Sequence, residues 1–280
     1  CKIQYNYTKG KFMNCRIVYL IACLLIISAC DRIDEATKKQ LKKEGKKVAK
    51  QVAGAAQHFD GKHTFVAFEA KQNTQRIKMF WKDNNGNILG SLQNLKTYVE
   101  SQGDTLLYAC NGGMYMQNQS PLGWYIENGK ERKPINTKAG KGNFYLNPKG
   151  IFYVQKNNLT KINSIQSEND RKKVPASTIN YLTQSGPMLV HEGKINALFT
   201  PSSLNINIRN GVGILQNGNA LFVMSTYPLC FYDFAKYFAD KGCKEALYLD
   251  GFVSRTYYPE ENYEQLDGGF GVMIGVVRKR

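Results

Sequence analysis

The segment Ala246-Leu-Tyr-Leu-Asp-Gly-Phe-Val-Ser254 gives the clearest indication of fold and function in the chain. Its apolar run follows a helical pattern and Gly242, and it is typical of a buried strand. The run breaks at Asp250-Gly251, so the end of this strand presents a carboxylate and a backbone turn. A carboxylate in such a place needs solvent, hydrogen bonds or a cation, and Arg209 is the best candidate partner. An Asp-Gly pair also marks ordinary hairpin turns, so that alternative stays open at this point.

The composition is that of a folded protein with one substantial core. The chain has 280 residues, of which 42% are hydrophobic and 21% are charged, enough for one core with at most a small appendage. Its formal net charge is +16, but much of that charge lies between Lys38 and Lys50. This local charge does not by itself indicate nucleic-acid binding, since an anionic membrane surface or an anionic polymer is as good a partner, and we expect no nucleic acid as a partner.

The N-terminal residues have the pattern of a bacterial lipoprotein signal peptide. Arg16 precedes an apolar run, residues 17–29, that is short for a membrane span and has the length of a secretory h-region. Ile27-Ser-Ala-Cys30 is similar to a lipobox, in which the cysteine is acylated and becomes the mature N-terminus. Met13 is the only methionine before the run, so we expect translation to begin there and residues 1–12 to be an over-extended reading frame. An uncleaved short anchor is the alternative.

These patterns divide the chain into three parts. We expect a signal peptide at residues 1–29, a lipidated N-terminus and basic tether at residues 30–60, and a folded domain at residues 61–280. Lysines of the tether would favour anionic lipid headgroups by about 1 kcal/mol each when close to the surface, although an ordinary solvated charge run has the same composition. The predicted location is the bacterial cell envelope, with a lipid anchor in the membrane and the domain on the periplasmic or another extracytoplasmic face.

The folded part begins near His63 and alternates short strands with two helices. Residues 64–70 and 76–82 have strand-length apolar patterns around a polar connection, which predicts a hairpin. Residues 88–101 and 231–241 have apolar side chains at helical spacing, and a glycine follows each pattern. Further strands are expected at residues 105–110, 121–129, 143–146, 150–154 and 221–225, with a polar surface excursion at residues 156–180. Residues 183–190 and 208–214 are each expected to place a glycine-marked polar stretch before another apolar strand.

Several of these strands end on glycines and polar side chains. The strand at residues 105–110 leads into Asn111-Gly112-Gly113, where backbone N–H groups and an amide can meet an anion or a developing oxyanion. Gly186 precedes another apolar run, and Arg209-Asn210 precedes a third. Arginine suits phosphate because its guanidinium makes two parallel hydrogen bonds. Taken singly, each of these motifs is also common in ordinary loops.

Taken in order, the motifs resemble the phosphodiester glycosidase domain family. That family is named for an enzyme that removes N-acetylglucosamine from a phosphodiester, and this chain is most similar to its small bacterial envelope members of uncharacterised function. The resemblance spans about residues 60–280 and implies an α+β fold, a single domain built on mixed β-sheet with packed helices. It rests on Asn111-Gly-Gly-Met-Tyr115, Gly142-Asn-Phe-Tyr145, Thr183-Gln-Ser-Gly-Pro-Met-Leu189, Arg209-Asn-Gly-Val-Gly213 and Leu247-Tyr-Leu-Asp-Gly251 with Ser254.

One motif departs from the family pattern. Better-studied relatives have Asp-Gly-Gly-Gly-Ser where this chain has Asp250-Gly251-Phe252-Val253-Ser254. Two bulky side chains replace glycine, which narrows or reshapes the pocket, and Phe252 could stack on the face of a sugar. The substrate therefore does not follow from the family resemblance.

The resemblance implies hydrolysis of a sugar-1-phosphodiester in an envelope glycan or glycolipid. The expected catalytic residues are Asp250, Arg209 and Asn111. A non-catalytic protein that binds an envelope glycan or phosphorylated glycolipid in the same cleft is the alternative, and a purely structural lipoprotein is a third. The expected substrate-binding residues are Gly112, Gly113, Gly186, Asn210, Gly251 and Ser254.

Other chemistries lack their motifs. His58, His63 and His191 have no metal-ligand spacing, and the chain has no Cys-x-x-Cys, Gly-x-Ser-x-Gly or P-loop pattern. We therefore expect no cofactor, with a divalent cation at Asp250 as the open alternative. Cys230 and Cys243 flank a predicted helix that spaces them roughly 20 Å apart, too far for a disulfide, so at least one of the thiols beyond Cys30 is expected to be free.

Overall fold

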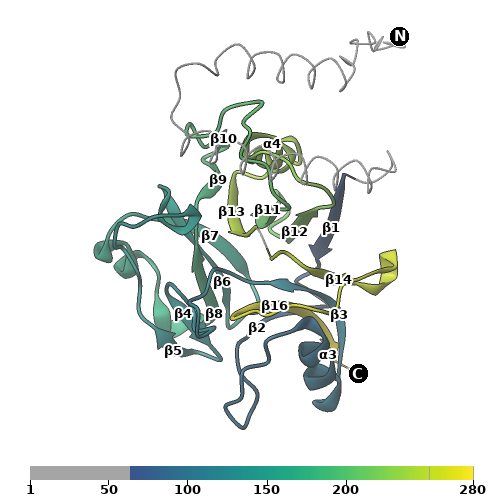
Figure 1. The fold of residues 1–280 in the computed structure, drawn as a ribbon. Helices are drawn as coiled ribbons and strands as arrows, with labels where there is room; N and C mark the ends of the chain where they lie inside the picture. The colour runs from purple at the N-terminus through teal and green to yellow at the C-terminus, as the bar shows by residue number, and fades with distance from the viewer. Residues whose placement is uncertain (1–63, 252, 280) are drawn as a thin grey trace, which may run out of the picture. The chain divides into compact units, whose positions relative to one another are not determined.

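The computed structural model describes residues 64–251 and 253–279 (Figure 1). The predictions for the signal peptide, Cys30, the basic tether and Phe252 lie outside these residues. No helix of the described residues is both long and apolar enough to cross a membrane.

Three antiparallel sheets form most of the described structure. The first has the strand order β1 (Phe65–Ala70), β12 (Ala220–Ser225), β11 (Asn210–Ile214), β13 (Glu245–Asp250), β9 (Met188–His191) and β10 (Lys194–Ile195). The second has the order β15 (Tyr263–Glu264), β14 (Thr256–Tyr258), β3 (Asp104–Asn111), β16 (Met273–Lys279) and β2 (Arg76–Phe80). The third has the order β5 (Lys130–Lys133), β4 (Tyr125–Glu127), β8 (Ile179–Ser185), β6 (Lys149–Gln155) and β7 (Thr160–Ile165).

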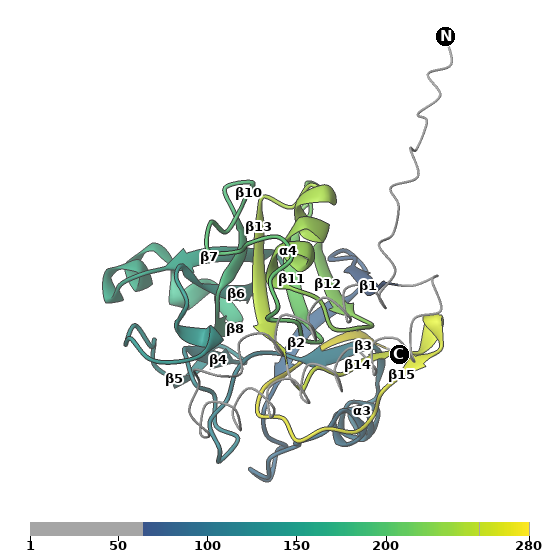
Figure 2. The same ribbon diagram turned by 45° about the horizontal axis from the view of Figure 1, so that its top comes forward.

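Two α-helices accompany the sheets, α3 (Leu92–Ser101) and α4 (Phe231–Asp240). Helix α3 begins after Ser91, whose side chain accepts a hydrogen bond of 3.1 Å from the Asn94 N–H and so satisfies one of the unpaired donors of the first turn. Helix α4 lies beside the first sheet (Figure 2), and its Phe234 and Phe238 pack against that sheet. The fold is therefore dominated by sheet. Its described strands pair antiparallel rather than in one mixed sheet.

The main core lies where strands of all three sheets contact one another. Tyr108 of the second sheet stacks against both Phe68 and Phe222 of the first, with ring centroids 4.8 and 5.4 Å apart. Phe152 of the third sheet meets Phe222 edge to face at 5.7 Å. These aromatic contacts contribute about 0.5–1.5 kcal/mol per pair beyond the area they bury.

The predicted hairpin at residues 64–82 is not formed. Strand β1 pairs with β12 in the first sheet, whereas β2 pairs with β16 in the second. The connecting turn moves the chain from one sheet to the other, and the Asn158 side chain fixes it by donating to the carbonyls of Gln72 at 2.7 Å and Gln75 at 2.8 Å. Each of the two strands therefore pairs with a strand that is distant in the sequence, and not with its neighbour across the short connection.

Other elements differ in detail from the prediction. Residues 143–146 were expected to be a strand, but Asn143–Tyr145 form a short 3-10 turn, η2, with Phe144 buried. The polar stretch at residues 156–180 contains β7, which pairs with β6 along its length. The predicted helix over residues 88–101 begins only at Leu92, because Ser91 caps it. The strands ending at Asn111 and Asp250 and the helix from Phe231 are confirmed.

Candidate active site

Asp250 is the last residue of β13 and lies opposite Asn210, the first residue of β11. The register between these strands shifts immediately after Asn210, so the ladder is irregular where the carboxylate stands. The Asp250 N–H donates to Oδ1 of Asn210 at 2.8 Å, and Oδ1 of Asp250 accepts the Gly251 N–H at 2.7 Å. One carboxylate oxygen is therefore fixed by the turn that follows the strand.

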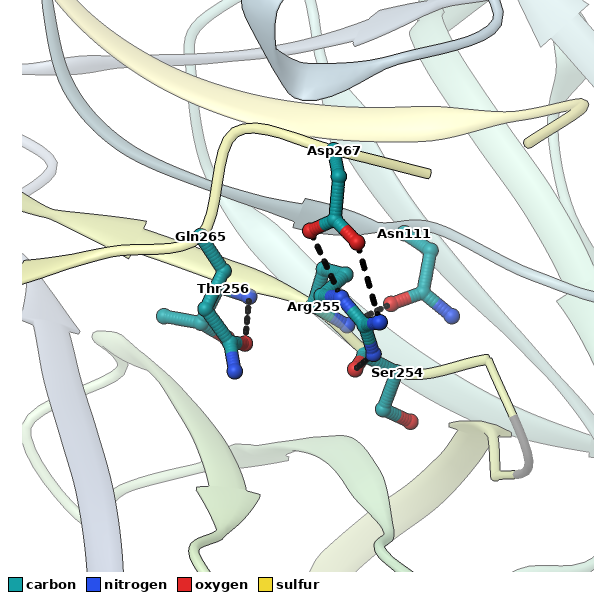
Figure 3. A network of polar contacts seen from close by, with 6 residues as sticks. All are labelled: Asn111, Ser254, Arg255, Thr256, Gln265 and Asp267. Atoms are coloured by element: carbon teal, nitrogen blue, oxygen red, sulfur yellow. Dashed lines mark hydrogen bonds and ion pairs between the residues drawn. The ribbon is translucent and has the colours of Figure 1, made fainter. Parts of the chain in front are cut away.

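Asn111 brings the second sheet into the same cluster. It ends β3, is fully buried, and accepts two hydrogen bonds from Nδ2 of Asn210, at 2.9 Å through its backbone carbonyl and at 2.8 Å through Oδ1. Its Oδ1 also accepts the Arg255 N–H at 3.1 Å (Figure 3). These contacts fix the orientation of the Asn111 amide. Its Nδ2 makes no hydrogen bond of good geometry among the described residues, but it lies close enough to the Asp250 carboxyl to lower the pKa of that group.

The Asp250 carboxyl has an unusual acidity for an aspartate. Burial raises its pKa from 3.8 to about 6, against the opposing effects of the Gly251 N–H and the Asn111 amide. Its negative charge contributes, after burial, to raising the pKa of the nearby Tyr115 hydroxyl. At neutral pH roughly nine tenths of the carboxyl is ionised. A partly exposed carboxylate with this pKa is suited to accept a proton or to stabilise a developing positive charge.

The turn after Asp250 is held by hydrogen bonds and one ion pair. The Ser254 N–H donates to the Gly251 carbonyl at 2.8 Å, and the Ser254 hydroxyl donates to the Asp250 carbonyl at 3.3 Å. Arg255 makes a two-pronged contact with Asp267, at 2.7 and 3.0 Å, and its Nη1 donates to the Ser254 carbonyl at 3.0 Å (Figure 3). Neither the neighbours nor the spacing of Arg255 in the sequence distinguishes it from a surface arginine, so its place in the cluster was not predicted.

The predicted pairing of Arg209 with Asp250 is not formed. Arg209 is fully buried, and its guanidinium donates through Nε to the Leu229 carbonyl at 2.8 Å and through Nη2 to the Asn205 carbonyl at 2.6 Å. Its Cζ lies 3.6 Å from the centroid of the Phe231 ring. Burial lowers its pKa. Adjacent residues of a strand point to opposite faces, which explains why Asn210 reaches Asn111 while Arg209 lies among residues of the α4 side.

Tyr248 connects Arg209 to the Asp250 turn. Nη1 of Arg209 lies 3.5 Å from the Tyr248 hydroxyl, and a hydrogen bond with Asn143 also acts on that hydroxyl. Burial raises the pKa of Tyr248 well above its ordinary value. A Cβ added at Gly251 would overlap the Tyr248 hydroxyl, so a glycine is needed there to leave room for it. The sequence showed Tyr248 only as part of an apolar run.

The expected glycine donors differ in their availability. The Gly112 N–H donates to the Val272 carbonyl at 2.8 Å, so the predicted phosphate-binding role does not hold for that group. The N–H groups of Gly113 and Gly186 have no acceptor among the described residues. A Cβ at Gly186 would lie 2.9 Å from the Phe144 carbonyl oxygen, which places the η2 turn directly beside it.

A cavity of about 900 Å³ adjoins this cluster. Ser254 and Arg255 line it on the side of the Asp250 turn, and Tyr263 lines it from β15. The cavity has room for a ligand of several rings beside the turn, because pockets that hold small molecules typically enclose about 300–1,000 Å³.

Metal ligands and disulfides are not found in the described part of the chain. No group of three or more histidine, cysteine, aspartate or glutamate side chains there could hold a metal ion. Cys110, Cys230 and Cys243 are buried free thiols. The prediction that at least one of these thiols is free is confirmed.

Comparison with known proteins identifies relatives of uncharacterised function. The chain is 38% identical over 224 residues to the uncharacterized protein YigE of Escherichia coli K12, covering 77% of this chain and 83% of that protein. Among solved structures, it is similar to the catalytic domain of zebrafish N-acetylglucosamine-1-phosphodiester alpha-N-acetylglucosaminidase, auto-inhibited by its pro-peptide. That similarity has a TM-score of 0.49 and 15% identity, over 78% of this chain and 89% of that one. A hypothetical protein from Synechocystis gives a TM-score of 0.47 and 16% identity, over 76% and 59% of the two chains.

The match to a protein family covers most of all three sheets. Residues 104–276 match the model of the phosphodiester glycosidase family. This range includes Asn111, Asn210 and Asp250, and it is more than half of the chain. The chain therefore belongs to the phosphodiester glycosidase family.

Proposed function

We propose that this protein hydrolyses a glycosyl phosphodiester at the anomeric carbon of the sugar. The observation that carries the proposal is the proximity of Asp250, whose pKa burial raises to about 6, to the buried Nδ2 of Asn111, which makes no hydrogen bond of good geometry. Family membership supports glycosidase-type chemistry. A carboxylate beside an unsatisfied amide donor is an arrangement that a substrate oxygen would complete.

Asp250 is the catalytic carboxylate in this proposal. A phosphomonoester is a good leaving group, so the reaction depends less on a strong general acid than ordinary glycoside hydrolysis does. Ionised Asp250 takes a proton from the attacking water or stabilises the oxocarbenium-like transition state. The Asn111 Nδ2 donates to a substrate oxygen. The fixed position of both groups lowers the reorganisation needed in the transition state.

The other site residues bind or position in this proposal. The N–H groups of Gly113 and Gly186 bind phosphate oxygens, and Ser254 and Gly251 shape the turn against the substrate. Asn210 positions both Asn111 and Asp250 through its three hydrogen bonds. Arg209 acts through Tyr248, as a positioning residue, because its two shortest contacts are with backbone carbonyls.

The proposed test compares turnover by the parent protein and two variants. Asp250→Asn keeps an acceptor oxygen for the Gly251 N–H but cannot ionise. Asp240→Asn, at an exposed carboxylate on α4 that pairs with Lys236, is the matched control. With a panel of glycosyl phosphodiesters, we expect the parent and Asp240→Asn to release free sugar and Asp250→Asn to release at least a hundredfold less, as for loss of a general base.

Two results would overturn this proposal. Turnover by Asp250→Asn at the parent rate would show that another group performs the chemistry. Binding of a phosphodiester by the parent without any release of sugar, and equally by Asp250→Asn, would instead favour the non-catalytic binding protein.

We also propose that the protein acts in the cell envelope as a lipoprotein, on an envelope glycan or glycolipid. The support is the Ile27-Ser-Ala-Cys30 pattern after a short apolar run. Each buried methylene of a lipid chain contributes about 0.8 kcal/mol, so two or more chains give stable attachment. Cys30→Ser should therefore lose metabolic fatty-acid label and detergent partitioning. Persistent labelling of that variant would place the anchor elsewhere.

A further inference from the structure

A second cavity lies apart from the residues of the Asp250 cluster. Its volume is about 780 Å³, and it is lined mainly by residues of β2, β3, β4, β5, β8 and α3 together with the loop after β2. In both ribbon views β2 lies between β4 and α3 (Figures 1 and 2). The cavity shares no lining residue with the Asp250 turn or with the cavity beside it. The proposed reaction therefore gives it no role.

Glu127 is the central polar group of this cavity. The residue is only 9% exposed, and its Oε1 accepts the Trp81 backbone N–H at 3.1 Å and the Tyr125 hydroxyl at 3.0 Å. Both hydrogen bonds fall on one oxygen. The nearest described cation to Oε2 is Nε of Arg132 at 3.9 Å, which is beyond hydrogen-bond length. A buried carboxylate oxygen is thus held rigidly with its acceptor positions open.

Aromatic side chains surround this carboxylate. Trp81 lines the cavity, and its indole N–H is buried without an acceptor among the described residues. Tyr98 and Tyr181 line the cavity from α3 and β8, and their hydroxyls already donate to Asn84 at 2.8 Å and to Asn128 at 2.6 Å. The walls therefore offer ring surfaces, with an open acceptor at Glu127 between them.

The charges of the cavity balance one another. Three basic side chains, Lys78, Lys82 and Arg132, face three acidic ones, Asp83, Asp104 and Glu127. Lys78 and Asp104 pair at 2.6 Å, and Asp83 accepts the N–H groups of its own loop at 2.8 and 2.9 Å. A strongly charged ligand would meet as many like charges as opposite ones. The lining is suited to a ligand that is uncharged, donates hydrogen bonds and has an apolar ring face.

We propose that this cavity binds a neutral sugar residue, with a pair of its hydroxyls donating to Glu127 and its C–H face against Trp81. A sugar ring combines hydroxyl donors at its edge with apolar C–H groups on its face, which matches an open carboxylate between aromatic walls. The site is non-catalytic and independent of the proposed reaction at Asp250. It would hold a glycan while chemistry proceeds elsewhere on the molecule.

Binding can be followed by the fluorescence of Trp81. The chain has two tryptophans, and the other, Trp124, is fully buried with its indole N–H bonded to Glu131 at 2.9 Å. The full chain, in a detergent without a sugar headgroup, is titrated with methyl glycosides of glucose, galactose, mannose and N-acetylglucosamine and with neutral oligomers of each. Calorimetry provides a second readout. At least one of these sugars should change the fluorescence and release heat.

Variants separate this site from the Asp250 cluster. Glu127→Gln keeps an oxygen for the Trp81 N–H and the Tyr125 hydroxyl but replaces the open carboxylate oxygen by an amide, and it should bind about tenfold more weakly, equivalent to about 1.4 kcal/mol. Glu260→Gln, at an exposed glutamate of the η5 turn (Pro259–Glu261), should bind as the parent does. Asp250→Asn should also bind as the parent does, whether or not it retains turnover.

Several outcomes would overturn the proposal. These are no binding by any neutral sugar of the panel, or equal binding by Glu127→Gln and the parent. If Glu127→Gln does not fold, Trp81→Phe decides by calorimetry, because it keeps a ring but removes the indole N–H and reduces the stacking surface. Undiminished binding by that variant would then refute the site.

Discussion

Asp250→Asn should stabilise the folded protein while it removes activity. Burial holds the pKa of Asp250 at about 6 in the folded state, above its ordinary value of 3.8. Above pH 6 the folded protein therefore carries an ionised carboxylate that would be more stable in the unfolded chain. The difference between the two pKa values corresponds to about 3 kcal/mol. Asparagine keeps an acceptor for the Gly251 N–H without this cost.

The sign of the effect fixes its pH dependence. Below pH 3.8 the Asp250 carboxyl is protonated in both the folded and the unfolded chain, so it does not lower the free energy of unfolding. As the pH rises through about 6, the folded protein loses this proton, and the buried charge then lowers the free energy of unfolding. The parent should thus lose stability relative to Asp250→Asn between about pH 4 and pH 6. At pH 7 the variant should melt roughly 6–12 °C higher, given the usual relation between free energy and Tm for a domain of this size.

The measurement is urea unfolding of both proteins in steps from pH 3 to pH 8. Asp240→Asn, at an exposed carboxylate, controls for removal of a negative charge as such. The reasoning is refuted if Asp250→Asn is less stable than the parent at pH 7. It is also refuted if the difference in unfolding free energy stays constant across this range, because burial of the ionised carboxyl would then not be its cause.

Three further predictions concern the same cluster. Arg209→Lys should lose one charged hydrogen bond to the Leu229 or Asn205 carbonyl, about 1.5–3 kcal/mol, and its Tm should fall by roughly 3–12 °C. An unchanged Tm with lost turnover would restore Arg209 as a direct phosphate ligand. Gly251→Ala should displace the Tyr248 hydroxyl and cost about 1–3 kcal/mol of stability. Thermal melting would be compared with that of Gly269→Ala, where a Cβ would meet no neighbouring atom, and equal melting temperatures of the two variants would contradict this prediction. The rate of sugar release should rise with pH through about 6 as Asp250 ionises, and a rate that falls over this range would assign Asp250 the role of an acid.

Much of the local structure could be predicted from apolar periodicity. Apolar side chains recur at strand spacing before Asn111 and Asp250 and at helical spacing from Phe231, and these side chains are buried in the structure. The prediction of a hairpin at residues 64–82 was wrong, because β1 and β2 pair with strands far away in the sequence. The short connection between them carries no information about those strands. The same limit applies to η2, where burial of Phe144 against the fold outweighs strand propensity.

Part of the candidate cluster could be predicted from the sequence, but not its contacts. Asn111, Asn210 and Asp250 were identified from strand ends and glycines, and the structure brings them together. The sequence could not show that Arg209 faces away from Asp250, since this depends on the strand's alternation and the bulge after Asn210. Nor could it show that the Gly112 N–H already donates to the Val272 carbonyl, because Val272 lies 160 positions later in the chain, just before β16.

The link between Asn111 and Asn210 has a consequence for how the protein fails under stress. Asn111 belongs to one sheet, and Asn210 and Asp250 belong to another. A small slip at this junction would separate the amide from the carboxylate while every strand kept its ladder intact. Partial openings of this kind need less free energy than global unfolding. Inactivation by heat or denaturant should therefore precede the loss of secondary structure, so the working lifetime of the protein would be set by this junction and not by its core.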